Sequence, residues 1–263
     1  VQYGELARAR GETLANNLEL DVGLHRGGLE DTTQLAAALR IIDEEPLLEL
    51  SGFMGYEPHV AKTPGLLGGP EAAFDRAQAS YREFTETAES LLGRSVADLT
   101  LNAAGSPTYQ RYDGRQVANE LSAGSALVKP TDFDLDSLAD HRPAAFIATP
   151  VLKVLPSARV PGMESLAGIM RWMDPNRAQA FFIYGGYWKA VPESPPGLSN
   201  HPIYGRSTNQ EMLNGSQSVD LSVDDWVFLR PTQSEHVFLQ FGDIAVYEDG
   251  EITGQWPVFA QGA

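Results

Sequence analysis

Apolar residues recur along the first half of the chain with two alternating periods, one typical of strands and one typical of helices. Short apolar runs predict strands at residues 18–23, 47–54, 98–103 and 117–121. Amphipathic stretches between them predict helices. Strands that alternate with helices favour a parallel sheet, so the first half is predicted to have an α/β fold.

Two of the predicted helices carry their own start and stop signals. Asp31 is a suitable N-cap, and Gln34 follows three residues later as a capping-box partner. Pro70 occupies a favoured first-turn position of the second helix, whose apolar stripe ends at Gly93. Local chemistry therefore supports the periodicity at both helices.

The pattern changes near residue 142. Residues 143–155, 181–184, 224–229, 237–241 and 244–247 predict extended or hairpin strands, and Gly185-Gly186 predicts a turn. Residues 192–214 contain Pro195-Pro196 and predict an irregular surface loop. We therefore expect a partial barrel domain at residues 1–140 and an antiparallel β domain at residues 141–263.

Each predicted strand of the first half ends in glycine-rich or polar residues, as the strands of a (β/α)8 barrel do at the active-site face. A complete barrel takes about 250 residues, whereas about 130 residues here hold roughly four units. We therefore expect the C-terminal half of a TIM-type barrel, with the other half upstream of residue 1. A doubly wound sheet is the alternative, but no G-x-G-x-x-G follows a predicted strand.

Composition narrows the function classes. A net charge of −16 argues against nucleic acid or an anionic membrane as the main partner. The absence of cysteine excludes disulfides and thiolate catalysis, and fits a cytoplasmic protein. No apolar run reaches the roughly 18 residues that a membrane span needs.

Two strand ends combine glycine with hydroxyl residues. Gly105, Ser106 and Thr108 follow the third strand, and Gly124 and Ser125 follow the fourth. Glycine lets backbone N–H groups approach an anion, and hydroxyls add donors, so these loops predict a phosphate cup. The alternative is two ordinary turns.

Arg26, Tyr56 and His59 follow the first two strands. An arginine at such a strand end can bind a carboxylate or a cofactor oxygen, and Asp21 is placed to orient it. Tyrosine and histidine together can serve proton transfer. The alternative interpretations are an exposed surface arginine and residues that close the edge of the core.

Gln233 and Glu235 alternate in a segment predicted to be extended, so both would face one side of a strand. Two such oxygens can bind a hard cation or a substrate ammonium group, but the histidines of a catalytic zinc site are missing there.

Taken in order, several segments resemble the D-serine dehydratase and D-threonine aldolase family, which are fold-type III pyridoxal-phosphate enzymes related to alanine racemase. The segments are D-V-G-L-H-R-G-G (21–28), G-x-x-G-Y-E-x-H (52–59), G-S-P-T-Y (105–109), E-L-S-A-G-S (120–125) and W-P-V-F (256–259). The resemblance covers nearly the whole chain.

The resemblance implies pyridoxal 5′-phosphate at the mouth of the barrel, and a homodimer whose β domain helps to complete the partner's active site. By motif it assigns the cofactor phosphate to Gly105, Ser106, Thr108, Gly124 and Ser125. It also places Arg26, Tyr56 and His59 near the cofactor ring or substrate, and Ser122 opposite the pyridine nitrogen.

The family carries its Schiff-base lysine on the first barrel strand, which we expect upstream of residue 1. Lys62, Lys129, Lys153 and Lys189 do not match that position. Relatives close their site with a Pro-x-His-x-Cys or Pro-x-His-x-Asp metal pair, where this chain has Gln233 and Glu235. This departure leaves a divalent metal, and the exact reaction, open.

The sequence therefore predicts a pyridoxal-phosphate-dependent lyase acting on D-3-hydroxy amino acids, by dehydration with deamination or by retro-aldol cleavage. Without a metal, His59 or Glu235 would be the acid that activates the leaving group. The alternatives are an amino-acid racemase, a non-catalytic pyridoxal-phosphate-binding homologue and a sugar-phosphate-binding half barrel.

Overall fold

The structure is a computed structural model that describes residues 2–156, 176 and 178–258. The chain divides into two compact units, one of residues 1–126 and 135–139 and the other of residues 127–134 and 140–263. Within the described part of the chain, no helix is both long enough and apolar enough to cross a membrane. Phe259, the last residue of the W-P-V-F segment, lies outside the described residues.

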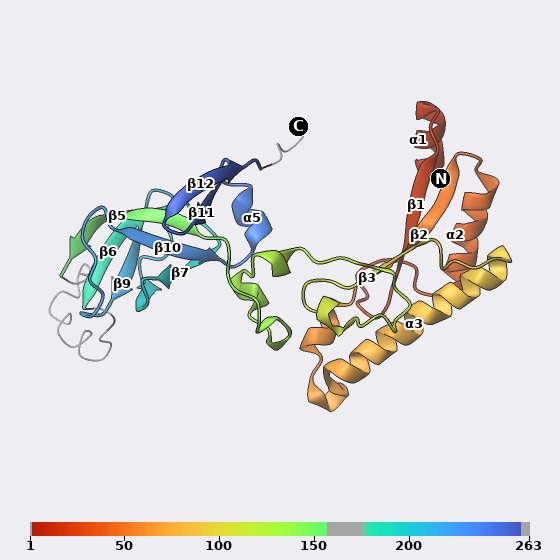
Figure 1. Cartoon of the computed structure of the whole chain (residues 1–263), viewed down its shortest axis with the longest axis horizontal. Coiled ribbons are helices and arrows are strands. Elements are labelled where there is room, and N and C mark those ends of the chain that lie inside the picture. The colour runs from red at the N-terminus through yellow and green to blue at the C-terminus, as the bar shows by residue number, and fades with distance from the viewer. Residues whose placement is uncertain (1, 157–175, 177, 259–263) are drawn as a thin grey trace. The chain divides into compact units, whose positions relative to one another are not determined.

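The first unit is built on a four-stranded parallel sheet in the order β1-β2-β3-β4. Its strands are β1 (Leu14–Leu20), β2 (Leu48–Gly55), β3 (Thr100–Ala103) and β4 (Glu120–Leu121). Its helices are α1 (Gln2–Arg10), α2 (Thr32–Glu44) and α3 (Gly69–Leu92). Figure 1 shows the long α3 running along the sheet beside α2. The predicted parallel sheet with intervening helices is confirmed.

Local signals account for the two predicted helices. The side chain of Asp31 accepts a hydrogen bond from the backbone N of Gln34 at 2.8 Å. The Gln34 side chain in turn accepts from the backbone N of Glu30 at 3.1 Å, one residue before the position expected for a capping box. Gly93 ends α3 in the left-handed conformation with φ 64°, which glycine adopts without steric cost.

The core of the first unit lies between the sheet and the helices. Buried side chains of α2 and α3 meet those of the strands there, among them Leu35, Phe53, Tyr81, Phe84 and Leu101. The Tyr81 hydroxyl donates to the carbonyls of Phe53 and Asn102 at 3.2 and 3.0 Å. It thereby ties α3 to two neighbouring strands close to their carboxyl ends.

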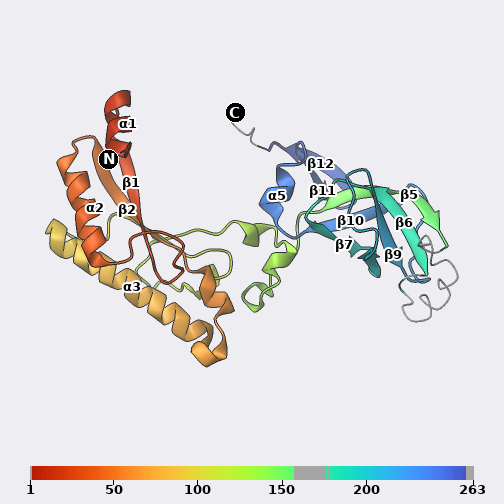
Figure 2. The same cartoon turned by 180° about the vertical axis from the view of Figure 1, so that it is seen from behind.

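The second unit is antiparallel, as predicted. Its main sheet has the order β7-β10-β5-β6-β9-β8, and every pair in it is antiparallel. The strands are β5 (Ile147–Leu155), β6 (Gln179–Tyr184), β7 (Ala190–Ser194), β8 (Leu198–Asn200), β9 (Gln210–Gly215) and β10 (Trp226–Pro231). A separate hairpin of β11 (Ile244–Glu248) and β12 (Glu251–Trp256) lies beside the short helix α5 (Ser234–Phe238) in both views (Figures 1 and 2).

Two predictions for the second half are wrong. Residues 192–214 are not an irregular loop, because they contain β8, β9 and the end of β7, whose backbone groups pair within the sheet. Residues 237–241 are not a strand, because α5 occupies residues 234–238. Ser234 and Val237 are the buried residues of α5, and their spacing of three fits a helix that rests one face on the core.

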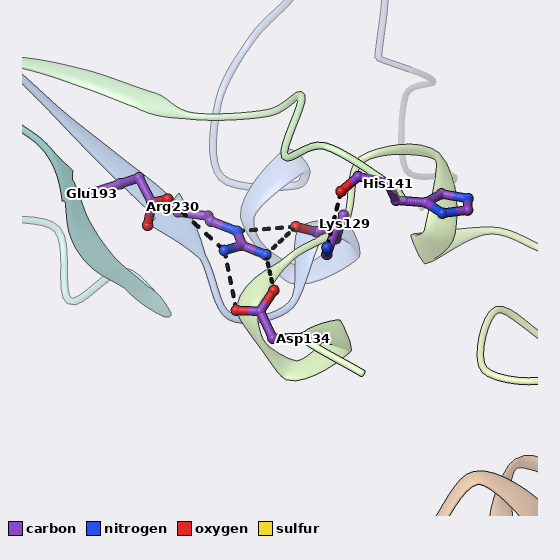
Figure 3. A network of polar contacts seen from close by, with 5 residues as sticks. All are labelled: Lys129, Asp134, His141, Glu193 and Arg230. Carbon is purple, nitrogen blue, oxygen red and sulfur yellow. Dashed lines mark hydrogen bonds and ion pairs between the residues drawn. The ribbon is translucent and has the colours of Figure 1, made fainter. Parts of the chain in front are cut away.

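A buried arginine attaches residues 127–134 to the second unit (Figure 3). The guanidinium of Arg230 donates twice to the carbonyl of Lys129, at 3.0 and 2.8 Å. It also donates to both carboxylate oxygens of Asp134, at 3.1 and 2.6 Å, and lies 3.9 Å from Glu193. The Lys129 ammonium donates to the carbonyl of His141 at 2.9 Å. Arg230 on β10 thus connects this segment to the antiparallel sheet.

Candidate functional site

The polar residues predicted from the sequence gather at one edge of the first unit. The strands β1 to β4 are parallel, so the loops that follow them all leave the sheet at the same edge. These loops are residues 21–28, 56–62, 104–108 and 122–125. The topology therefore brings four separate sequence motifs into one neighbourhood.

Asp21 organises the first of these loops. Its carboxylate accepts from the backbone N of Gly23 and of His25, both at 2.9 Å, and lies 2.8 Å from His25 Nδ1. Burial acts to raise the pKa of Asp21, but the hydrogen bonds from His25 and Gly23 outweigh it, so the pKa lies below its usual value. Asp21 therefore stabilises the turn and contacts His25, whereas the sequence suggested that it orients Arg26.

Arg26, Tyr56 and Gly105 form a stack that joins three of the loops. The guanidinium carbon of Arg26 lies 4.8 Å from the centroid of the Tyr56 ring, within the range of a cation–π contact. A Cβ atom at Gly105 would lie 2.4 Å from Cε2 of Tyr56, so only glycine allows the ring to lie there. The Arg26 side chain is exposed, which leaves its N–H donors accessible to a ligand.

His59 lies in the 3-10 helix η1 (Pro58–Lys62), beside the first loop. A Cβ at Gly23 would be 3.2 Å from His59 Nε2. His59 Nδ1 is buried and has no hydrogen-bond partner within the described residues. Burial lowers the pKa of His59, and the charges of His25 and Arg76 act in the same direction. The imidazole is therefore neutral at neutral pH, the form that can accept a proton.

Ser106 connects the third loop to the fourth. Its hydroxyl oxygen accepts from the backbone N of Gly124 at 3.2 Å and of Ala126 at 2.9 Å. Because a hydroxyl can accept two hydrogen bonds and still donate one, the Ser106 proton remains available. The backbone N–H groups of Ser106 and Ser125 make no hydrogen bond within the described residues. Amide and hydroxyl donors of this kind are the groups that bind anions in proteins.

Thr108 is buried, and its side chain contacts Glu57. It is 1% exposed, and its hydroxyl donates to the carboxylate of Glu57 at 2.7 Å while accepting from the backbone N of Gly105 at 3.2 Å. Its side chain is therefore engaged inside the loop. The partner is Glu57, to which the sequence analysis gave no role. Glu57 is part of the G-x-x-G-Y-E-x-H segment, but the residues around it in the sequence do not indicate which donors it contacts.

Ser122 follows β4 and is held by a buried amide. Asn102 Nδ2 donates to the Ser122 hydroxyl at 2.9 Å and to Glu120 at 2.8 Å. The Ser122 side chain is thereby oriented from β3, while the residue itself is exposed at the sheet edge.

Gln233 and Glu235 do not share one side of a strand, so that prediction is wrong. β10 ends at Pro231, and Glu235 lies in the first turn of α5. The Gln233 side chain accepts from the Lys189 ammonium at 3.1 Å. Among the described residues, no three His, Asp, Glu or Cys side chains gather as metal ligands would. These two positions belong to the second unit.

Three of the four lysines lie in the second unit. Lys129, Lys153 and Lys189, all in the second unit, each donate to an oxygen acceptor of their own unit. Lys62 is exposed at the end of η1.

Comparison with known families agrees with this geometry. Residues 2–132 match the family model of the alanine racemase N-terminal domain. This part of the chain belongs to that family. The alanine racemase-type domain thus contains the sheet and all four loops described above.

Solved structures resemble the chain over nearly its whole length. The D-threonine aldolase from Filomicrobium marinum gives a TM-score of 0.73 at 16% identity, over 97% of this chain and 65% of that chain. The D-threo-3-hydroxyaspartate dehydratase from Delftia sp. HT23 gives 0.68 at 15% identity, over 98% and 69%. The alanine racemase from Bacillus anthracis gives 0.66 at 13% identity, over 97% and 71%. No curated protein matches the sequence. These likenesses show the fold of a barrel part followed by a β domain.

Proposed function

We propose that this chain is part of a pyridoxal-phosphate-dependent lyase that acts on D-3-hydroxy amino acids. The observation that carries the proposal is the stack of Arg26, Tyr56 and Gly105 beside loops that Ser106 ties together. A guanidinium, a phenol and hydroxyl groups at the carboxyl edge of the sheet support the proposal, because barrel enzymes hold their ligands at that edge.

The residues present fit pyridoxal 5′-phosphate. The phosphate needs several N–H or O–H donors, and the amides of Ser106 and Ser125 with the Ser106 hydroxyl would supply them. Tyr56 and Arg26 offer donors to oxygens of the ring or of the substrate carboxylate. Ser122 offers a neutral hydroxyl at the same edge, and it is held by Asn102.

The bound cofactor would act as the electron sink for a carbanion at the substrate α-carbon. Arg26 would bind and orient the substrate carboxylate, because its guanidinium is exposed and held against Tyr56. His59, neutral at neutral pH, would accept a proton or hold it near the substrate hydroxyl. Ser122 carries no positive charge, so the site lacks a permanent cation at that position.

The substrate class is supported by the neighbours whose names specify 3-hydroxy D-amino acids, namely the D-threonine aldolase and the D-threo-3-hydroxyaspartate dehydratase. The second candidate is an amino-acid racemase, which the alanine racemase neighbour favours. Racemisation needs a base on each face of the substrate.

We further propose a homodimer with shared active sites, which sedimentation of the purified protein would test.

The experiment is a product analysis of the native protein with pyridoxal 5′-phosphate and either D-threonine or D-serine. A lyase releases glycine and acetaldehyde from D-threonine by cleavage, or a 2-oxo acid and ammonia from either substrate by dehydration. Conversion of one enantiomer to the other, with no loss of amino acid, would instead establish the racemase.

The Glu235→Gln variant tests the remaining acid candidate, since unchanged turnover would remove Glu235 from the mechanism.

A further inference from the structure

Glu57 is a buried carboxylate that holds the turn leading into the anion-binding loop. It is 1% exposed and follows β2 directly. Its Oε1 accepts from the Thr108 hydroxyl at 2.7 Å, and its Oε2 accepts from the backbone N of Ala104 at 3.3 Å. One side chain at the end of β2 therefore contacts both ends of the loop after β3.

The backbone of this loop needs such support. Ala104 has φ 72°, in the left-handed region that is strained for a non-glycine residue. The conformation turns the chain sharply at the end of β3, and the Ala104 N–H then points at Glu57. Thr108 closes the loop by accepting from Gly105 N and donating to Glu57.

The surroundings of the carboxylate include a tyrosine that is held from α3. Tyr112 interacts electrostatically with Glu57, and Gln78 of α3 donates to the Tyr112 hydroxyl at 2.9 Å. Each of these groups is buried or half-buried. A buried carboxylate persists where several donors satisfy it, and the Ala104 amide and the Thr108 hydroxyl are two such donors for Glu57.

The position of this carboxylate beside an anion site is unexpected on charge alone, because a negative group opposes phosphate binding. The contacts give it another use. Ser106 lies between Ala104 and Thr108, and it supplies the amide and hydroxyl donors that remain open. Any change in the turn would displace those donors.

We propose that Glu57 is a positioning residue that fixes residues 104–108, so that the Ser106 donors meet the phosphate of the cofactor. The inference rests on the proposed function, since it assumes that the cup takes a phosphate. Glu57 itself does not touch the ligand. It acts through the left-handed Ala104 and through Thr108.

The test compares two probes that differ only in the phosphate, pyridoxal 5′-phosphate and pyridoxal. Dissociation constants are measured by absorbance and fluorescence titration of the wild type and of Glu57→Ala, Glu57→Gln and Thr108→Val. We expect the wild type to prefer pyridoxal 5′-phosphate, and E57A and T108V to lose about tenfold of this preference, the equivalent of one charge-assisted hydrogen bond. Affinity for pyridoxal should change little.

Glutamine keeps one acceptor oxygen, so E57Q should retain more of the preference than E57A. The matched control is Glu211→Ala, which removes an equally buried carboxylate, 4% exposed, from β9 of the second unit. E211A should lower the melting temperature while leaving the preference unchanged. If E57A does not fold, T108V decides the result alone.

Two outcomes separate the inference from the proposed function. A wild type that binds both probes equally would overturn the phosphate cup, and with it the proposed function. A wild type that prefers the phosphate, with T108V or E57A keeping that preference, would overturn only the role of Glu57. An E57Q preference no better than that of E57A would also overturn the acceptor role.

Discussion

The two units each contain a buried charged residue that attaches a loop to a strand, and they use it differently. Arg230 in the second unit donates to the carbonyl of Lys129 and to the carboxylate of Asp134, so these hydrogen bonds hold one part of the chain to another. Glu57 in the first unit attaches a loop whose Ser106 donors remain open. A buried, hydrogen-bonded charged residue therefore attaches a segment to the sheet in one unit, and in the other it holds the loop that we propose to bind the phosphate.

The secondary structure explains the difference. In the second unit the strands are antiparallel, and loops leave the sheet at both ends, so polar groups are spread out. In the first unit the parallel strands bring four loops to one edge. Open donors at that edge can cooperate on one ligand, whereas open donors scattered over the second unit would not meet.

The largest effect that tests this comparison is expected from Arg230→Ala. The change leaves the Lys129 carbonyl and the half-exposed Asp134 carboxylate without their buried donor, and losing hydrogen bonds from a charged group costs about 2–3 kcal/mol of unfolding free energy. Denaturant titration followed by the fluorescence of Trp226, in the same strand, measures the loss. The preference for pyridoxal 5′-phosphate over pyridoxal should stay at its wild-type value, and a parallel loss of that preference would contradict a purely structural Arg230.

Ser106→Ala should affect binding more than stability. It removes the common acceptor of the Gly124 and Ala126 amides, which would loosen the fourth loop, and it also removes a donor to the phosphate. We expect pyridoxal 5′-phosphate to bind about tenfold more weakly, with about 1–2 kcal/mol of stability lost. Ser137→Ala is a matched control, because the buried Ser137 hydroxyl has no partner within the described residues. Equal effects of the two variants on binding would remove Ser106 from the site.

Much of the first unit was predictable because its signals are local. The apolar stripe of α3 and the Gly93 that ends it are visible in a short stretch of sequence, and the alternation of strands and helices indicates the parallel sheet. Arg26, Tyr56 and Gly105 were recognised because strand-terminal polar residues meet at one edge in this topology. The sequence pattern thus located the edge and several of its residues.

The errors lie where partners are distant in sequence. Glu57 and Thr108 are 51 residues apart, and neither position has a local feature that indicates the contact. β9 becomes a strand by pairing with β6 and β8, whereas Pro195-Pro196 marks only the turn between β7 and β8. The apolar residues of α5 were interpreted as a strand, although a short apolar run does not distinguish the period of a helix from that of a strand.

The pH dependence of the protein's stability tests whether Glu57 behaves as a buried carboxylate. Burial raises the pKa of Glu57, and the hydrogen bonds from Thr108, Ala104 and Tyr112 only partly oppose it. The folded protein therefore holds this proton more tightly than the unfolded chain, and the stability it contributes is lost as pH rises above the ordinary value of 4.5. The stability of the wild type relative to Glu57→Gln should fall with increasing pH in that range, by about 1 kcal/mol for each unit of pKa shift. Melting curves between pH 4 and 7 measure it, and a pH-independent difference would contradict the raised pKa.

The smallest effect is expected at His25, the exposed partner of Asp21. Its side chain is 82% exposed, so the ion pair is screened by water and worth less than about 0.5 kcal/mol. His25→Ala should therefore leave the melting temperature and both dissociation constants nearly unchanged. Asp21→Ala should weaken pyridoxal 5′-phosphate binding instead, because the amides of Gly23 and His25 lose their acceptor in the loop that presents Arg26. If H25A weakened binding as much as D21A, the exposed ion pair, and not the backbone hydrogen bonds, would be what holds Arg26 over Tyr56.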